Sequence, residues 1–457
     1  MMVVTNDTIA AIATPPGRGG VGIIRLSGAD APTIAKQLLE HGSQSHDLGT
    51  REARFSSFLA EDGMLIDSGI LIYYPQPASY TGEHVVELQG HGGRVVMTML
   101  LDRVIELGAR QARPGEFTER AFINNKIDLV QAEAVAGLID SVSSQAARSA
   151  IRSLEGEFSH NINDLLQRLV ELRMFVEGAL DFPEEEIDFI QEAGVKEKIS
   201  ACIDELGKIL KGAQQGAILG EGLHMAIVGR PNVGKSSLLN RLAGRETAIV
   251  SKTPGTTRDV VDENIIIEGA PLNILDTAGI RESKDDIEEE GIKRALNAAG
   301  QADIILLLLE YGEDIGIEEQ RVLDVCPGNI KVVVVKNKID LADNKQELLE
   351  KNTGETEVFL SARTGEGVEE LVQCLKIIMG LSSTNEDVCM ARTRHLNALS
   401  ETKGFLDQGM QHLENKNTME LLAEDLRLAQ ESLGAVTGSF VADDLLGEIF
   451  SKFCIGK

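Results

Sequence analysis

The 457-residue sequence contains no tryptophan, and aromatic residues make up only 4% of it. Proteins that bind single-stranded nucleic acid on stacking platforms need more aromatic side chains than this. Positive charge is also scarce: 44 basic residues face 72 acidic ones, so the formal net charge is 44 − 72 = −28. Such a chain lacks the basic surface that coats nucleic acid or anionic membranes without specificity, although local basic patches are compatible with it.

Cysteine and long apolar runs are sparse as well. The five cysteines form no Cys-x-x-Cys pair, and an odd number in a large chain does not indicate a disulfide framework. This usage is typical of a reducing cytoplasm, so we expect a cytoplasmic protein. The first residues lack a basic stretch followed by a long apolar core, which argues against a signal peptide. The longest apolar runs, such as Ile304–Leu309, are too short to span a bilayer.

The order of strand-like and helix-like segments predicts several domains. Strand-forming runs and turn residues dominate residues 1–120, which we expect to form an α/β domain. Apolar residues at helical spacing dominate 121–215, strand–loop–helix patterns return in 216–380, and 381–457 are again helical. The simplest arrangement of these segments is a multidomain fold, α/β plus α, in which a second α/β domain is inserted into a helical one. Two independent helical segments are the alternative.

A glycine-rich phosphate-binding motif lies in the second α/β region. Residues Gly229 to Ser236 fit G-x-x-x-x-G-K-[ST], between an apolar strand at Met225–Val228 and a helix at Ser237–Leu242. Backbone N–H groups and the positive helix end of such a loop cradle phosphates. We expect Lys235 to reach the β- and γ-phosphates and the Ser236 hydroxyl to bind Mg²⁺.

Four further motifs follow in the order found in Ras-like GTPases. Gly255–Asp259 includes Thr257, which can complete the Mg²⁺ shell, and Asp276–Gly279 can meet the metal and the γ-phosphate. Asn337–Asp340 ends in a carboxylate that accepts two N–H donors from guanine, which adenine cannot supply in that arrangement. Ser361–Arg363 would back the base. The five motifs predict a Ras-like P-loop domain that hydrolyses GTP. The predicted GTP-binding residues are Asn232, Val233, Gly234, Lys235, Ser236, Ser237, Ser251, Lys252, Thr253, Pro254, Gly255, Thr256, Thr257, Asp276, Thr277, Ala278, Gly279, Asn337, Lys338, Ile339, Asp340, Ser361, Ala362 and Arg363.

The position that usually orients the attacking water carries an apolar residue. Ras-type enzymes place a glutamine directly after Asp-x-x-Gly, whereas this chain has Ile280. Another group must therefore orient the water. The nearby acidic candidates are Asp285, Asp286, Glu288, Glu289 and Glu290. Most of them are equally explained as a solvated helix start, where the helix dipole favours acidic residues.

Three stretches outside these motifs carry a family resemblance: Thr14–Gly28, Tyr80–Gly93 and the tail Phe453–Lys457. Together with a GTPase domain placed between helices, they resemble the MnmE (TrmE) family of tRNA-modification GTPases, within the TrmE-Era-EngA-YihA-Septin-like superfamily, over essentially the whole chain. The resemblance implies a cytoplasmic homodimer that works with the flavoprotein MnmG on tRNA and not on membranes. It further implies addition of a carboxymethylaminomethyl or aminomethyl group at C5 of the wobble uridine of certain tRNAs.

The resemblance also implies a ligand for the N-terminal domain, which would mediate dimerisation and bind 5-formyltetrahydrofolate or a related folate. Its contacts would be Arg25, Glu87, Lys126 and Lys457, for which ordinary surface ion pairing is the alternative. The tail residue Cys454 would take part in the modification chemistry, with a buried structural cysteine as the alternative.

In the GTPase domain the resemblance implies stimulation by potassium. The cation would be held by Asn232, Ser251, Thr253 and Thr256, while Mg²⁺ would be held by Ser236 and Thr257. Glu288 is the carboxylate that would orient the attacking water. The expected catalytic residues are therefore Glu288, Lys235 and Cys454.

A ribosome-assembly GTPase is the rival interpretation, because it would share the same five nucleotide motifs. Such proteins usually append basic RNA-binding domains, whereas the parts added here are an acidic α/β region and helices. A membrane-associated switch is disfavoured because no anchor or basic amphipathic helix is evident.

Overall fold

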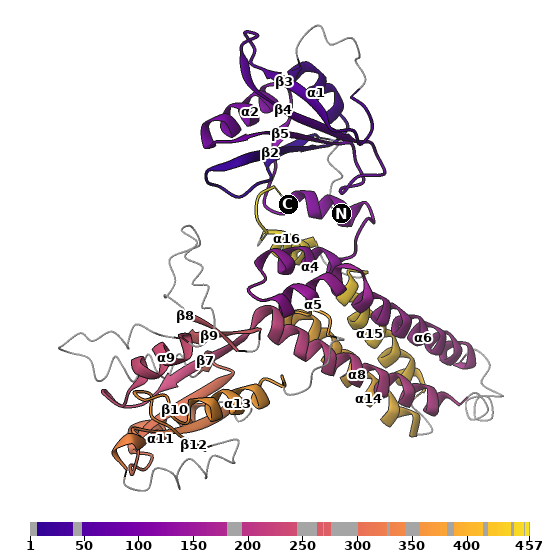
Figure 1. The fold of residues 1–457 in the computed structure, drawn as a ribbon. Coiled ribbons are helices and arrows are strands. Elements are labelled where there is room, and N and C mark those ends of the chain that lie inside the picture. The colour runs from indigo at the N-terminus through magenta and orange to yellow at the C-terminus, as the bar shows by residue number, and fades with distance from the viewer. Residues whose placement is uncertain are drawn as a thin grey trace. The chain divides into compact units, whose positions relative to one another are not determined.

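The computed structural model describes residues 7–39, 48–180, 194–244, 263–267, 269–275, 300–326, 330–342, 357–381, 388–414, 419–439, 443–451 and 453–456 (Figure 1). Contacts divide the chain into two compact units, residues 1–136 with 431–457 and residues 137–430. Within the described residues, no helix combines the length and the apolarity needed to cross a bilayer.

The first unit contains a six-stranded sheet in the order β3-β4-β5-β2-β1-β6. Pairing is antiparallel except between β1 and β6, which are parallel. The strands are β1 (Ile9–Ile12), β2 (Gly19–Ser27), β3 (Arg54–Leu59), β4 (Leu65–Tyr74), β5 (Val85–Gly92) and β6 (Arg110–Gln111). The sequence predicts β1, β2, β4 and β5 from their apolar, β-branched runs, and β3 and β6 are additions.

Helices α1 (Ala31–Leu38) and α2 (Arg94–Glu106) cover one face of this sheet (Figure 1). The core beneath them includes Leu26, Leu71 and Leu88, one from each of three neighbouring strands, and all three are fully buried. Burial of an aliphatic side chain of this size stabilises a fold by roughly 1.5–3 kcal/mol.

The opposite face of the same sheet carries exposed apolar side chains. Phe55, Ile70, Gln89 and Ile23 are cross-strand partners, so they form one row across β3, β4, β5 and β2. Phe55 is 76% exposed and Ile70 is 38% exposed. Because successive side chains of a strand point to opposite faces, this row lies on the face away from α1 and α2.

The C-terminal end of the chain is part of the first unit. The first unit contains α3 (Glu116–Ile123) and α16 (Asp443–Ser451), while α4 (Leu129–Asp140) and α15 (Met419–Thr437) each have residues in both units. Phe450 and Phe453 pack in one apolar cluster with Leu129 and Phe122.

The second unit contains a six-stranded sheet in the order β12-β11-β10-β7-β9-β8, parallel except for β8. The strands are β7 (Leu223–Val228), β8 (Glu263–Ile267), β9 (Ala270–Leu275), β10 (Ile304–Glu310), β11 (Lys331–Asn337) and β12 (Glu357–Phe359). The helical elements of this part are α9 (Lys235–Ala243), α11 (Ile317–Val325), the short 3₁₀ helix η2 (Ile339–Leu341) and α13 (Val368–Ile378).

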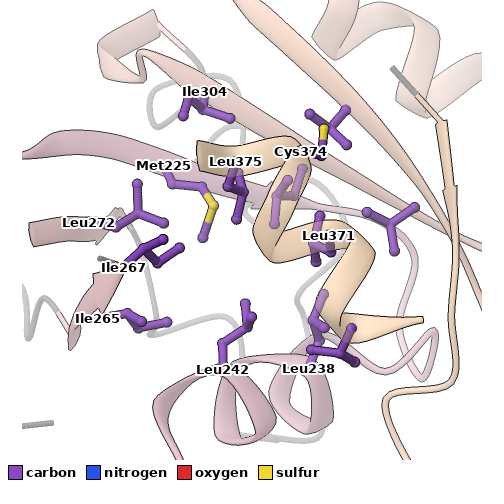
Figure 2. Close-up of a cluster of buried hydrophobic side chains, with 14 of the residues drawn as sticks. Met225, Leu238, Leu242, Ile265, Ile267, Leu272, Ile304, Leu371, Cys374 and Leu375 are labelled. Atoms are coloured by element: carbon purple, nitrogen blue, oxygen red, sulfur yellow. The ribbon is translucent and has the colours of Figure 1, made fainter. Parts of the chain in front are cut away.

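Apolar clusters lie on both faces of this parallel sheet. On one face, Met225, Leu272 and Ile304 pack in the same cluster as Leu371 and Leu375 of α13 (Figure 2). On the other face, a second cluster joins buried residues of β10 to α11. Strands buried on both faces read as continuous apolar runs, as the leucine-rich β10 does.

Helices from both sides of the GTPase segment pack together in the second unit. They are α5 (Ser144–Leu154), α6 (Glu157–Leu180), α8 (Val195–Glu221) and α14 (Thr393–Glu414), and α8 contacts the other three. The hydroxyl of Ser153 donates to the Met390 carbonyl at 2.9 Å, and the Met390 N–H donates to the Ser149 carbonyl at 3.1 Å. The predicted α/β domain inserted into a helical one is confirmed, with α8 running on to Glu221 instead of ending near Gln215.

Candidate functional sites

The phosphate-binding loop lies between β7 and α9, where the motif predicts it. Gly234, immediately before α9, has φ +106°, and a Cβ atom there would lie 2.3 Å from Nδ2 of Asn337. Glycine is therefore required both by the backbone conformation and by the close approach. Within the described residues α9 has no side-chain cap, so the helix presents its positive end where phosphate is expected.

Lys235 is folded back onto its own loop. Its Nζ donates to the carbonyl oxygens of Gly229 at 2.5 Å and Arg230 at 3.0 Å. Burial lowers the pKa of Lys235 below its usual value. An ammonium that is partly desolvated and held by neutral carbonyls gains strongly from an anion, so this geometry suits phosphate binding.

The base-recognition motif is joined to the phosphate loop by Asn337, which is 2% exposed. Its Nδ2 donates to the Val233 carbonyl at 2.7 Å, and its Oδ1 accepts from the Ala362 N–H at 2.9 Å. One side chain therefore connects three of the predicted GTP-binding segments.

Both carboxylate oxygens of Asp340 have partners from the Ser361–Arg363 segment. The Ser361 hydroxyl donates to Oδ1 at 2.6 Å, and Nη2 of Arg363 lies 2.6 Å from Oδ2. Ser361 is fully buried, so it fixes the carboxylate that would read the base.

In the first unit, Arg25 and Glu87 are cross-strand partners on β2 and β5. Nη2 and Nε of Arg25 lie 2.9 and 3.0 Å from Oε1 of Glu87. The guanidinium carbon also lies 5.9 Å from the centre of the Tyr80 ring and 5.8 Å from that of Phe117. This arrangement combines a cation, a carboxylate and two aromatic rings within one site.

The start of α3 contacts both this site and the C-terminal tail. Phe117 supports Arg25, and the Thr118 hydroxyl lies 3.0 Å from the Tyr80 hydroxyl. Burial raises the pKa of Tyr80. The tail contacts the residue before the same turn, because the Gly115 N–H donates to the Cys454 carbonyl at 3.4 Å.

The tail is seated by close backbone approach. Ile455 forms a β-bridge with Pro114. Gly456 has φ +98°, and a Cβ atom there would lie 2.4 Å from the Ile12 carbonyl oxygen at the end of β1. The Cys454 side chain is exposed and its thiol is not in a disulfide, so the buried structural cysteine considered from the sequence is wrong.

Lys126 is tied to the loop that carries Tyr80. Its Nζ donates to the Pro77 carbonyl at 3.1 Å. Nearby, Nδ2 of Asn124 donates to the Thr81 carbonyl at 2.7 Å.

Comparison with known proteins covers the whole chain. Family models match residues 129–454, as the MnmE helical domain, and residues 8–126, as the GTP-binding protein TrmE N-terminus. The tRNA modification GTPase MnmE of Hydrogenovibrio crunogenus is 52% identical over 99% of both chains, and that of Stutzerimonas stutzeri is 50% identical over 100% of both. The chain belongs to the MnmE family.

A solved structure of Era in complex with MgGDPNP and a segment of 16S ribosomal RNA is 30% identical, covers 40% of this chain and 66% of that chain, and has a TM-score of 0.26.

Membership of the MnmE family confirms three expectations from the sequence: the family itself, the class of GTP hydrolase, and the mixed α/β and helical fold. It favours a tRNA modification GTPase over the ribosome-assembly alternative. The roles of individual residues stay predictions.

Several predicted site residues lie outside the described part of the chain. They are Ser251, Lys252, Thr253, Pro254, Gly255, Thr256, Thr257, Asp276, Thr277, Ala278, Gly279, Glu288 and Lys457. Of the proposed cation ligands, Ser236 lies in the first turn of α9, and Asn232 is exposed in the loop with φ +63°.

Arg230, inside the phosphate loop, forms an ion pair that the motif does not predict. Its Nε donates to Oε1 of Glu319 at 3.0 Å, and its Nη1 lies 3.6 Å from Oε1 of Glu313. Glu319 is only 3% exposed. The only sign of this ion pair in the sequence is a charged residue at a variable position of the motif. The sequence does not reveal its partner, which lies 89 positions further along the chain.

A second set of unpredicted contacts surrounds α3. Glu116 is 1% exposed and accepts from Nη2 of Arg110 at 2.6 Å and from the Arg113 N–H at 2.7 Å. Arg120 bonds to Glu83 at 3.1 Å and to Glu116 at 3.3 Å. Burial alone would raise the pKa of Glu116, but the hydrogen bonds and charges of these arginines hold it below its usual value. The network anchors the helix that contacts both Arg25 and the tail.

Proposed function

We propose that the protein hydrolyses GTP in a potassium-stimulated manner and, with the flavoprotein MnmG, adds a carboxymethylaminomethyl or aminomethyl group at C5 of the wobble uridine of certain tRNAs. A folate one-carbon donor, 5-formyltetrahydrofolate or a relative, supplies carbon to this reaction. The observation that carries the proposal is that the Arg25–Glu87 pair and the C-terminal tail both contact the start of α3, Arg25 at the Phe117 ring and the tail at Gly115.

The residues of the N-terminal site suit the two chemical ends of a folate. Its glutamate carboxylates call for cations, which Lys126 provides, with Lys457 as a second by family resemblance, whereas Arg25 lies with Glu87 at the pterin end. Its pterin ring presents N–H donors, which the Glu87 carboxylate accepts. Tyr80, which is 37% exposed, supplies aromatic surface beside the guanidinium, and the fully buried Phe117 packs against the guanidinium from inside the fold.

The tail adds chemistry to this site. Cys454 is the exposed thiol of the tail, and its backbone is held at Gly115, two residues before Phe117. We assign Cys454 a role in the modification step, and we assign the terminal residue to the folate pocket.

In the GTPase site, Lys235 moves from the loop carbonyls to the β- and γ-phosphates when GTP binds. Ser236 and Thr257 would hold Mg²⁺, which supplies charge neutralisation at the phosphates. Asn232, with Ser251, Thr253 and Thr256, would hold potassium. Glu288 orients the attacking water in place of Ile280, and Asp340 reads the guanine base.

The exposed row on the N-terminal sheet supports the proposed homodimer. Phe55, Ile70 and Ile23 lie on the same sheet face as Arg25 and Glu87, because residues two apart on a strand share a face. A second copy of the chain that covers this row would also close the folate site. We therefore propose a cytoplasmic homodimer formed through residues 1–120.

The experiment that tests this function removes the tail. Deletion of residues 454–457 should eliminate 5-formyltetrahydrofolate binding in calorimetry and tRNA modification, while potassium-stimulated GTP turnover stays near normal. Cys454→Ser is the matched control, because it should keep folate binding and lose modification. If the truncated protein binds the folate as tightly as the intact one, the tail is only a packed chain end and the proposal fails.

A further inference from the structure

The carboxylate that would read guanine is already engaged by a guanidinium. Nη2 of Arg363 lies 2.6 Å from Oδ2 of Asp340, while Oδ1 accepts from the Ser361 hydroxyl. The two partners differ sharply in exposure, since the Asp340 side chain is 9% exposed and the Arg363 side chain is 76% exposed. Arg363 therefore reaches from solvent onto a nearly buried acceptor.

The backbone that carries Arg363 is held without help from its side chain. Nε of Arg241 donates to the Ala362 carbonyl at 3.3 Å, and Nη2 of Arg241 donates to the Arg363 carbonyl at 2.5 Å. The Ala362 N–H also donates to Asn337. Because these contacts fix the loop, the guanidinium can leave Asp340 while the segment stays in place.

A guanidinium and the N–H edge of guanine present the same chemistry to a carboxylate. Each is planar and offers adjacent N–H donors, which pair with the two oxygens of one carboxylate. The two sets compete at Oδ2, because Nη2 of Arg363 lies 2.6 Å from this oxygen, where a guanine N–H would also have to approach.

We infer that Arg363 is an internal competitor of guanine at Asp340. Its guanidinium occupies an acceptor that the base needs, and it must swing into solvent before the base can pair. This inference rests on the proposed role of Asp340 in base reading, and it reverses the expected role of Arg363, which the motif alone assigns to backing the base. The pair lowers the rate of nucleotide capture.

The test is the association rate constant of a fluorescent GDP analogue, measured by stopped flow on the full chain. Arg363→Ala should raise this constant about two- to fivefold, the range that an exposed ion pair supports. Arg363→Lys keeps the charge but loses the planar guanidinium, so its association rate constant should lie between those of the wild type and Arg363→Ala. Arg321→Ala removes the same charge from an exposed position of α11 and should leave the constant unchanged.

Salt provides a second measurement. Because ions screen an exposed pair, the ratio of the Arg363→Ala constant to that of the wild type should fall toward one between about 0.05 M and about 1 M salt. If the Arg363→Ala constant is no higher than that of Arg321→Ala at low salt, the inference is wrong. The same conclusion follows if only dissociation accelerates, because that result places Arg363 on the bound base.

A separate measurement shows whether Asp340 reads the guanine base at all. An Asp340→Asn variant that binds GTP as well as the wild type removes Asp340 from base reading. If Asp340→Asn switches to xanthosine nucleotides but Arg363→Ala leaves the association rate constant unaltered, Asp340 reads the base and only the proposed competition by Arg363 is wrong.

Discussion

Asn337 donates its side-chain N–H to the Val233 carbonyl at 2.7 Å, although the two residues lie 104 positions apart. The contact places the end of β11 against the phosphate loop, and Gly234 has no room for a side chain because of it. The loop that would hold the phosphates and the segment that would hold the base are therefore held together by a direct hydrogen bond. Any ligand that spans both must match a spacing set by this side chain.

Potassium should stimulate GTP hydrolysis, and sodium should not. A cation at Asn232 would stabilise the charge that an arginine finger stabilises elsewhere, where the finger contributes roughly 10³ to 10⁵ in rate. Asn232→Ala should abolish the stimulation and leave nucleotide affinity largely intact, measured as turnover over a saturating range of each salt. Equal rates in sodium and potassium for the wild type would contradict the cation site.

Asp340→Asn should weaken GTP binding and improve binding of xanthosine triphosphate. The change replaces a pair of acceptors by one acceptor and one donor, which suits a base with a carbonyl where guanine has its amine. Equilibrium titration with both nucleotides measures the switch. Unchanged GTP affinity would show that this carboxylate does not read the base.

The local structure of the phosphate loop could be predicted from the sequence. The strand, loop and helix around Lys235 follow from a motif whose residues are consecutive. The partners of Arg230 and Asp340 could not be predicted in this way, because Glu319 and Arg363 are brought close only by the folded sheet.

In the first unit, β3 was not predicted because two serines between Phe55 and Phe58 interrupt its apolar pattern, and β6 was not predicted because it has only two residues. The pairing of Arg25 with Glu87 depends on strand register across 62 positions, so only the family resemblance pointed to it. The exposed row beside that pair follows from the same register and had no signal in the local sequence.

Glu116→Gln should destabilise the first unit at neutral pH by about 3 kcal/mol, because it removes a buried carboxylate charge from its arginine partners and leaves the buried Arg120 without it. The pKa of Glu116 is lowered by folding, so its contribution is present at neutral pH and is lost as the pH falls through that lowered value. The difference between wild type and variant should therefore shrink as the pH falls through that lowered pKa. Burial raises the pKa of the neighbouring Glu119, so the contribution of Glu119 to stability changes with pH in the opposite direction.

Thermal melting of both proteins across this pH range measures the effect. A difference between them that stays constant from neutral to acidic pH would mean that the carboxylate charge is not what Glu116 contributes.

Phe55→Glu should dissociate the homodimer without unfolding the chain, because Phe55 is 76% exposed and its loss costs little in the monomer. Sedimentation velocity at several concentrations measures the shift. Met174→Glu is the matched control, since Met174 is 67% exposed on α6 in the second unit. A dimer that persists equally in both variants would place the interface elsewhere.

The most direct test of the account measures wobble-uridine modification in cellular tRNA by nucleoside mass spectrometry. The account predicts that deleting this gene removes the C5 modification. The wild-type chain should restore it, and the chain that lacks residues 454–457 should not. Retention of the modification in the deletion strain, or its restoration by the truncated chain, would contradict the account.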